Sequence, residues 1–552
     1  MSKTSVLALS LLLLAGCSGA NHYVQRATLA INEAVYRTHV AKLASDEFEG
    51  RAPGSPGERK TVEYLEQQFL ALGLQPVDGA SFRQQVPLVE ITAVPAQARL
   101  GFAGGGRQMD LALGEDMVIG TRRVQPSSAI SDSEVVFVGY GVVAPEYGWN
   151  DYEGLDMRGK TALILVNDPG YGSGDPGLFR GRAMTYYGRW TYKYEEAARQ
   201  GAAAAIIIHQ TAPAAYPWEV VRNSWTGPQF WAETADGNAD ALALEAWITE
   251  ARAREVLAMA GQDLDALQRA ALQRGFRGKP LGVTASGSVR NLIRRASSPN
   301  VAGYLPGRDR RDEYVIYMAH WDHLGKGLAL AGDTIYNGAV DNATGVAGLL
   351  AIAAAYRELL LLPSRSVLFL AVTAEESGLI GSEYYARYPL VPLEKTAAVI
   401  NMDGMQPLGR ALDIEVIGSG ASELEILLAD AAKRQGRVVK PDSRPEHGYF
   451  YRSDHFNLAK EGVPSLYTKV GVDLRDRPPG TGQAMLEEYT RERYHKQSDD
   501  YDPAWDVSGN IEDLRLLFEV GLQVGAAPSW PNWYEGNEFR AKRDASQQAR
   551  KP

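Results

Sequence analysis

Five short segments place histidine and carboxylate side chains where metal ions could be held. They are His320-Trp321-Asp322, Asp341-Asn342, Glu375-Glu376, Asn401-Met402-Asp403 and His495. Zinc binds imidazole and carboxylate groups, and other divalent cations accept the same ligands. A carboxylate that bridges two metal ions about 3.5–4 Å apart leaves positions open for a water and an amide oxygen. The residue types therefore indicate a two-metal site that hydrolyses amide bonds.

Each segment on its own has an ordinary explanation. An aspartate that follows a buried strand, such as Asp341 or Asp403, often only caps the next helix. If each segment had only such an ordinary role, five unrelated coincidences would be needed to produce the ordered set. The set as a whole therefore favours one shared site.

Two further features of these segments suggest a division of roles. Glu375 and Glu376 are adjacent on an extended segment, so their side chains point in opposite directions. One of them can bind metal while the other accepts a proton from the attacking water. Asp322, two residues after His320, is placed to orient that histidine through a hydrogen bond.

The elements that must position these residues can be predicted from the apolar pattern. Continuous apolar runs at residues 314–319, 367–372 and 397–402 are typical of parallel strands buried on both faces. The apolar stretch 345–359 predicts a helix between the first two strands. An alternation of strand, loop and helix predicts an α/β fold, in which the strand ends meet at one edge of the sheet. The separated segments can therefore converge.

The rest of the chain divides around this part. Helical spacing predicts helices over 28–43 and 62–72, with a turn-rich loop at 45–55 between them. From about residue 95 the pattern changes to short β-like runs, at 135–138, 162–166 and 204–208, and a helix includes 195–200. This stretch has no His, Asp and Glu cluster with ligand spacing.

We therefore predict a non-catalytic domain inserted into a catalytic one. The predicted ranges are 26–95 for the first part of the catalytic domain, 96–290 for the insertion, 296–525 for the remainder and 526–552 for a polar tail that is expected to fray.

The first seventeen residues have the pattern of a targeting segment. Lys3 precedes an apolar run at 6–14, which is too short for a membrane span of roughly 20 residues. Leu14-Ala15-Gly16-Cys17 resembles the bacterial lipobox, and Cys17 is the single cysteine of the chain. We predict a lipoprotein signal peptide at 1–17 and a lipid on Cys17. Ser18 after the cysteine favours the periplasmic face of the outer membrane in the bacterial cell envelope.

Composition limits the classes of partner. The chain has 552 residues, of which 45% are hydrophobic and 22% charged, as in ordinary globular proteins of two or three domains. The formal net charge of −10 argues against nucleic acid as a partner, because phosphate binding needs a basic face. A membrane contact is expected only through the N-terminal lipid.

The ordered set of metal-type residues resembles the co-catalytic di-zinc aminopeptidase family, which also includes glutamate carboxypeptidase and the catalytically silent transferrin receptor. The loop 45–55 and Arg452-Ser453-Asp454-His455-Phe456 resemble further motifs of bacterial members, and residues 152–163 resemble part of a protease-associated domain. The resemblance implies a three-layer α/β/α zinc-exopeptidase domain with a mostly parallel central sheet, plus an inserted β-rich protease-associated domain.

The same resemblance implies a role for each residue. One zinc ion would take His320 and Asp403, the other Glu376 and His495, and Asp341 would bridge them. Glu375 would be the general base and Asp322 would orient His320. Structural roles are expected for nearby residues: His323, His455 as a loop organiser, and Trp321 and Trp225 in packing, whereas Tyr449 or Tyr451 could donate a hydrogen bond to the substrate.

The expected function is a zinc-dependent aminopeptidase that hydrolyses N-terminal residues from peptides through a metal-bridging water activated by Glu375. A metallocarboxypeptidase of the same fold stays open, because the arginines that would bind a substrate carboxylate are not placed by the sequence. A glutaminyl cyclase with one zinc is disfavoured by the intact pair of sites. A catalytically silent peptide-binding protein is disfavoured because Glu375 and all five ligands are present. Monomer and dimer both stay open.

Overall fold

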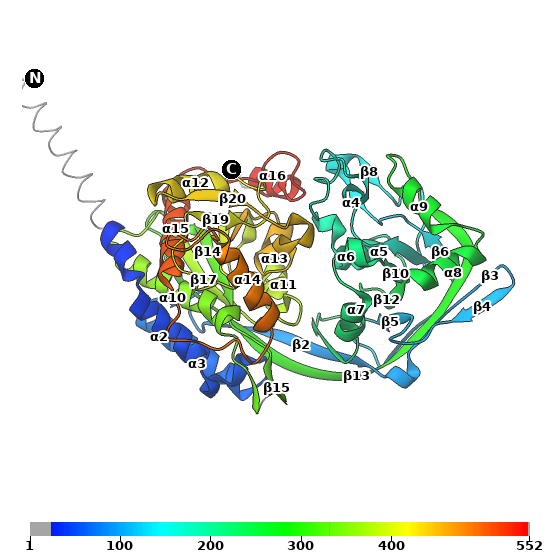
Figure 1. Ribbon diagram of the computed structural model, residues 1–552, viewed down its shortest axis with the longest axis horizontal. Helices are drawn as coiled ribbons and strands as arrows, with labels where there is room; N and C mark the ends of the chain where they lie inside the picture. The colour runs from blue at the N-terminus through cyan, green and yellow to red at the C-terminus, as the bar shows by residue number, and fades with distance from the viewer. Residues whose placement is uncertain (1–23, 331, 550–552) are drawn as a thin grey trace, which may run out of the picture.

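The computed structural model describes residues 24–330 and 332–549, so the predicted signal peptide and Cys17 lie outside the described residues. The described chain forms two bodies side by side, joined along one side by a long ribbon (Figure 1). The ribbon consists of β2 (Arg83–Ala93) and β13 (Lys279–Leu305), which pair antiparallel from Asn291 to Val301 on β13. A single strand, β13, therefore runs from one body into the other.

The central sheet of the first body is parallel in its middle. Its neighbouring parallel strands are β17 (Arg365–Val372), β14 (Arg310–His320), β18 (Thr396–Asn401) and β21 (Ser465–Val470). Antiparallel strands extend both edges, because β13 pairs with β17 and β19 (Asp413–Val416) pairs with β21. The three strands that the apolar runs predicted are therefore β14, β17 and β18.

Helices cover both faces of this sheet. One layer contains α2 (Glu33–Leu43), α10 (Thr344–Arg357) and α15 (Ser508–Ala526), and the other contains α11 (Ile380–Arg387) and α13 (His455–Lys460). Alternate residues of β14 face opposite layers: Val315 and Tyr317 belong to the core with α10 and α15, whereas Ile316 and Met318 pack with Tyr385 of α11. This arrangement confirms the three-layer α/β/α prediction.

Helix α10 belongs to the most apolar segment of the chain and lies in the centre of the first body. The stretch Ala339–Arg357 is long and apolar enough to cross a membrane, but 94% of its most apolar window is buried inside the protein. Burial on all sides explains why α10 shows no polar face in the sequence.

Two sequence predictions for the ends of the chain need correction. The helix predicted over 28–43 is interrupted, because the Asn32 side chain accepts a hydrogen bond from Val35 N and so starts α2 at Glu33. The polar tail does not fray over its described part. Trp533 is fully buried and donates to Gly462 O, and the buried Arg543 donates to Thr396 O. Single anchoring side chains thus hold a segment whose composition is polar.

The second body is built on another sheet. Its parallel strands are β6 (Ser127–Phe137), β9 (Thr161–Leu165), β10 (Ala204–His209) and β12 (Leu244–Thr249). The first half of β13 pairs antiparallel with β6 and with β3 (Arg99–Gly104). Helices α5 (Trp190–Arg199) and α8 (Glu250–Met259) pack on the sheet, so this body contains more helix than a purely β-rich domain.

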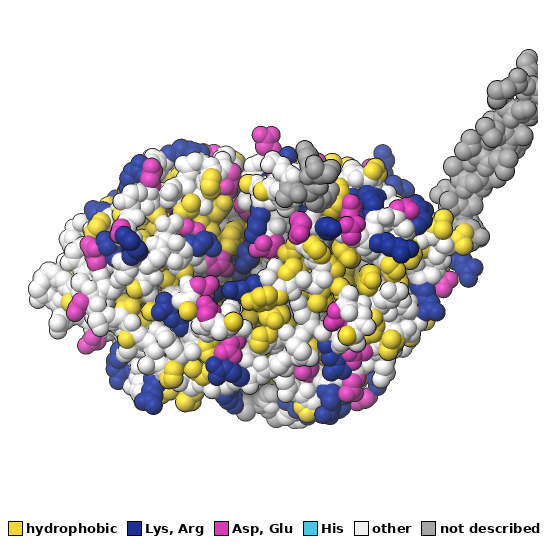
Figure 2. All heavy atoms as spheres, turned by 180° about the vertical axis from the view of Figure 1, so that it is seen from behind, with side chains coloured by type: hydrophobic (Ala, Val, Ile, Leu, Met, Phe, Trp, Pro, Cys, Tyr) yellow, Lys and Arg dark blue, Asp and Glu magenta, His cyan; other side chains and the backbone are white. Residues whose placement is uncertain are grey.

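The two bodies also meet away from the ribbon. Met184 N donates to Pro445 O at 3.1 Å, and Lys460 Nζ lies 3.6 Å from Glu195 Oε1. Figure 2 shows the bodies meeting near the middle of the rear face, with side chains of both charges along the seam. The inserted segment therefore contacts the loops of the first body directly.

Candidate metal centre

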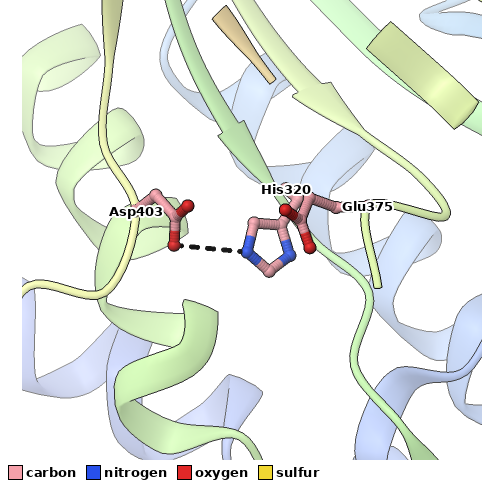
Figure 3. Close-up of side chains that lie close together, drawn as sticks. All are labelled: His320, Glu375 and Asp403. Carbon is pink, nitrogen blue, oxygen red and sulfur yellow. Dashed lines mark ion pairs between the residues drawn. The ribbon is translucent and has the colours of Figure 1, made fainter. Parts of the chain in front are cut away.

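The metal-type residues lie at one edge of the central sheet. His320 is the last residue of β14, Glu375 follows β17 by three residues and Asp403 follows β18 by two. Figure 3 shows these three side chains turned toward one another from the ends of their strands. Asp341 joins them from the turn before α10, and His495 from the loop after α14 (Thr481–Glu492). The parallel register brings together residues that are up to 175 positions apart, from His320 to His495.

Asp341 lies between the two histidines. Its Oδ1 is 3.2 Å from His320 Nε2, and its Oδ2 is 3.2 Å from His495 Nε2. Each histidine also faces a second carboxylate: Asp403 Oδ1 is 3.6 Å from His320 Nε2, and Glu376 Oε2 is 3.1 Å from His495 Nε2. The side chains thus form two ligand groups that share Asp341.

The centre is buried except on the side of His495. The His320 side chain is 0% exposed and that of Glu376 6%, whereas that of His495 is 39% exposed. The buried His320 Nε2 makes no hydrogen bond of good geometry despite the two nearby carboxylates. An imidazole nitrogen without a hydrogen bond that faces carboxylate oxygens is suited to bind a cation.

Electrostatics show that the negative charge of the cluster requires compensation. Burial alone would lower the pKa of His320, but the charges of Glu375, Asp341 and Asp403 outweigh it and raise that pKa well above its usual value. Burial alone would raise the pKa of Asp341, but the two histidines beside its carboxylate lower that pKa well below the usual range. Excess carboxylate in a buried site favours divalent cations.

Ligand-type atoms also come close enough for coordination. One atom from each of His320, Glu375 and Asp403 lies within 4.8 Å of the others, and the same holds for His323, Asp341 and Glu376. The residues present therefore fit a pair of divalent cations, with oxygen and nitrogen donors of the kind that zinc accepts.

His323 and Asp322 hold the glutamates in place. His323 Nδ1 is 2.6 Å from Glu376 Oε1, which is the oxygen opposite to the one that faces His495. Asp322 accepts hydrogen bonds from the backbone N–H groups of Glu375 at 3.1 Å and Glu376 at 3.4 Å. Its Oδ1 is 3.8 Å from His320 Nδ1, too far for a hydrogen bond. The backbone oxygen of Asp322 lies 3.2 Å from His320 Nδ1, so Asp322 contacts the histidine through its main chain and the glutamate segment through its carboxylate.

Asp499 fixes the backbone around Asp341, and the sequence analysis gave it no role. Its carboxylate accepts hydrogen bonds from Val340 N at 3.2 Å, from Asp341 N at 3.1 Å and from Tyr489 Oη at 3.2 Å. Burial raises the pKa of Asp499 to about 6. Its place in the His495 segment was the only sequence signal for this contact.

Arg51 links the turn-rich loop to the centre and was also missed. The buried guanidinium donates to the backbone oxygens of Trp321, Leu43, Asn337 and Gly338. Three of these carbonyls lie close to the centre in the chain, because Trp321 follows His320 and Asn337 and Gly338 precede Asp341. The resemblance of loop 45–55 to a family motif was the signal that could have identified this arginine.

A cavity of about 300 Å³ opens beside the centre. Asp341, Glu375 and Asp403 line its floor. Its walls are aromatic and charged, with the side chains of Tyr449, Tyr467, Tyr489, Tyr494, Arg444, Arg452 and Lys469 and the acids Glu415 and Asp442. The ring of Tyr494 stacks on His495 at 3.9 Å between centroids. The sequence could not identify this lining, because it comes from several segments that lie far apart in the chain.

The structure also gives the positions of the tyrosines and of the second histidine that the sequence analysis named. Tyr449 lines it, whereas the hydroxyl of Tyr451 donates to Glu538 at 2.8 Å. His455 is buried between Phe450 and Tyr467, which agrees with the expected organising role.

The two tryptophans are packing residues. Trp321 is fully buried and donates to Pro299 O at 3.0 Å, and Trp225 packs edge-on against Trp190 in the second body.

Part of the chain is similar to a known peptidase family and to several known peptidases. Residues 300–518, which include all five ligand-bearing segments, match the sequence profile of peptidase family M28. Over 129 residues the chain is 37% identical to Aminopeptidase NAALADL1 of Mus musculus, covering 22% of this chain and 16% of that protein. Over 162 residues it is 32% identical to a Glutamate carboxypeptidase 2 homolog of Caenorhabditis briggsae, covering 28% and 19%. The chain thus spans less than a fifth of each of these relatives.

A solved structure is similar over most of the chain. The aminopeptidase from Aneurinibacillus sp. strain AM-1 superimposes with a TM-score of 0.47 at 21% identity, covering 93% of this chain and 97% of that one.

Proposed function

We propose that this chain, whose residues 300–518 match the sequence profile of peptidase family M28, is a zinc-dependent aminopeptidase that removes N-terminal residues from peptides. The observation that carries the proposal is the position of Asp341, with one carboxylate oxygen at 3.2 Å from each of two histidines. A carboxylate in that position can hold two cations next to each other at the floor of a cavity large enough for part of a peptide.

In this proposal the ligands divide as the resemblance implied. His320 and Asp403 would hold one zinc ion, Glu376 and His495 the other, and Asp341 would bridge. When bound, the two ions would acidify a water and polarise the scissile carbonyl. His323 and Asp322 would act by holding the glutamates, since they contact Glu376 and the backbone of residues 375 and 376.

Glu375 would be the general base. It lines the cavity beside Asp341 and Asp403, and within the described residues its side chain forms no ion pair or hydrogen bond with a cationic residue. Burial, reinforced by the neighbouring acids, raises the pKa of Glu375 well above its usual value. A raised pKa makes the carboxylate a better proton acceptor. Glu375 would take the proton of the attacking water and pass it to the leaving amine.

Two parts of the proposal concern the rest of the chain. Residues 96–290 would form a protease-associated domain, and the segment 184–189 of this domain would border the substrate cavity through the contact of Met184 with Pro445. Cys17 would carry a lipid that attaches the protein to the periplasmic face of the outer membrane.

The test is hydrolysis of a panel of aminoacyl-nitroanilides by the purified protein, with and without chelator and added zinc. Matched N-acetylated peptides are assayed beside them. Chelator-sensitive cleavage of the free-amine substrates only is the expected result. Cleavage of the acetylated peptides from their carboxyl end would contradict the aminopeptidase assignment and indicate a carboxypeptidase of the same fold.

A further inference from the structure

Two arginines lie together at one wall of the cavity. Arg444 and Arg452 line it directly, and the guanidinium carbon of each lies 5.7 Å from the ring centre of Tyr449, so the ring supports both cations. Arg189 approaches from the inserted body, at the start of α5. Burial, reinforced by the positive charge of Arg452, lowers the pKa of Arg189 to about 10. The guanidinium of Arg189 is therefore near enough to Arg452 for their positive charges to interact, although Arg189 is not part of the cavity lining.

The inserted body is packed closely enough to fix this position. Met184 N donates to Pro445 O, and a Cβ added to Gly448 would lie 2.6 Å from Met184 Sδ. Gly448 has a φ of +63°, so the close approach and the backbone conformation both require glycine. The loop that carries Arg444 and Arg452 is thus held against the segment that carries Arg189.

These cations have no anionic partner in the protein. Over residues 24–330 and 332–549, no carboxylate forms an ion pair with Arg189, Arg444 or Arg452, and the Nε atoms of Arg189 and Arg452 are buried without an acceptor. The acids nearby already accept backbone hydrogen bonds: Asp442 from Arg444 N at 2.9 Å, and Glu415 from Ser443 N at 2.5 Å.

Such an arrangement has a cost that a ligand can remove. Partly buried guanidinium groups without a counter-ion lose part of their hydration, and like charges repel each other. The cost is notable in a chain that carries 67 acidic and 57 basic residues, since carboxylates are in excess elsewhere. A planar anion that accepts paired N–H donors would satisfy both arginines of the cavity wall.

We propose that Arg444 and Arg452 bind a carboxylate group of the peptide substrate. The inference rests on the proposed aminopeptidase function and names its substrate class. The carboxylate comes either from the C-terminus of a di- or tripeptide or from the side chain of an acidic N-terminal residue. Both groups present the same planar oxygen pair, and both can lie in the cavity that begins at Asp341 and Glu375.

The test compares matched peptide pairs with the full, zinc-loaded chain. The first pair is Leu-Ala-Ala with a free carboxylate or a carboxamide at its C-terminus, and the second is Glu-Ala-Ala-amide against Gln-Ala-Ala-amide. We expect kcat/KM to favour the carboxylate member of at least one pair. In Arg444→Gln and Arg452→Gln that preference falls by about tenfold to a hundredfold, the range for hydrogen bonds to a charged group. The pair that responds identifies the source of the carboxylate.

Controls separate recognition from folding. Arg182→Gln removes the same charge from an exposed arginine of the adjoining inserted segment and should keep the preference. Arg452→Lys keeps the charge but not the paired donors, so it should keep part of the preference. Unchanged melting temperatures show that the variants fold.

The proposal is overturned if the unsubstituted chain treats both members of each pair alike, within about twofold. It is also overturned if the glutamine variants lower both members equally. Absence of chelator-sensitive cleavage of every substrate would instead refute the proposed function. In that case calorimetric binding of the same pairs to Glu375→Gln decides the inference, because equal Kd values, or no binding of either member, would exclude a carboxylate site.

Discussion

Arg51→Met removes the guanidinium that ties the loop 45–55 to the candidate metal centre while it keeps much of the side-chain volume. The guanidinium donates to Trp321 O at 2.9 Å, Leu43 O at 2.8 Å, Asn337 O at 2.7 Å and Gly338 O at 2.8 Å. These contacts hold the segments that carry His320 and Asp341 at a fixed separation. The variant should therefore lower both the stability of the fold and the affinity for zinc.

The magnitude follows from the number and type of these contacts. Each hydrogen bond with one charged partner contributes about 1.5–3 kcal/mol, but four bonds from one group are not additive. Burying the guanidinium also has a cost that methionine does not carry, and burial lowers the pKa of Arg51 to about 10. Loss of one member of a buried charged network costs about 3–5 kcal/mol. We expect a decrease of that size in the free energy of unfolding.

Zinc affinity reports on the geometry of the centre separately from stability. Residues that orient metal ligands typically change affinity by about tenfold to a hundredfold when they are replaced. Denaturant unfolding of the metal-free protein measures the first effect, and competition with a chromogenic chelator measures the second. Arg59→Met is the matched control, since Arg59 is exposed on α3 (Pro56–Ala71).

The reasoning is refuted if Arg51→Met unfolds within about 1 kcal/mol of the unsubstituted protein and binds zinc with the same affinity. A loss of stability with unchanged zinc affinity would show that Arg51 supports the fold but does not set the distance between the ligand segments.

Three further outcomes are expected. Glu375→Gln should retain its metal, as measured by elemental analysis, yet lose at least about a hundredfold in kcat, because it removes only the proton acceptor; near-normal activity would exclude Glu375 as the base. Asp341→Asn should lose zinc and activity together, and excess zinc should restore less activity to it than to the chelator-treated parent protein; full recovery would argue against a bridging role. Burial lowers the pKa of His39 from 6.5 to about 4, so the unfolded chain binds a proton that the folded chain does not, and stability should fall by about 2–3 kcal/mol as the pH drops from 6.5 to 4. Denaturation curves across that range should show a smaller fall in His39→Gln, and an identical fall would assign the acid sensitivity to other groups.

The sequence determined the central sheet and the identity of the residues at its edge. Continuous apolar runs require burial on both faces, and only parallel strands covered by helices provide it, so β14, β17 and β18 were predictable. Parallel strands end at one edge, so the residues after them had to converge. Ligand types and their order then sufficed to name His320, Asp341 and Asp403 together.

Local sequence patterns predicted helix bounds and chain ends less reliably, because a single side chain can determine where an element starts or whether a segment is anchored. Asn32 interrupts a helix that periodicity alone extends, because its amide caps the following turn. Trp533 anchors a segment whose composition is polar. The course of β13 through both bodies was also not visible, since each half of that strand gains its pairing partners from a different sheet.

Only the tertiary structure decided which groups support and surround the centre. Arg51 and Asp499 hold backbone atoms of segments far away in the sequence, and such contacts leave no periodic pattern. The contact between the inserted body and the loop of Arg444 and Arg452 depends on how the two bodies pack. Periodicity in the sequence shows which face of a helix or strand is buried. Which distant segment of the chain covers that face is determined by packing and by the need to satisfy buried polar groups.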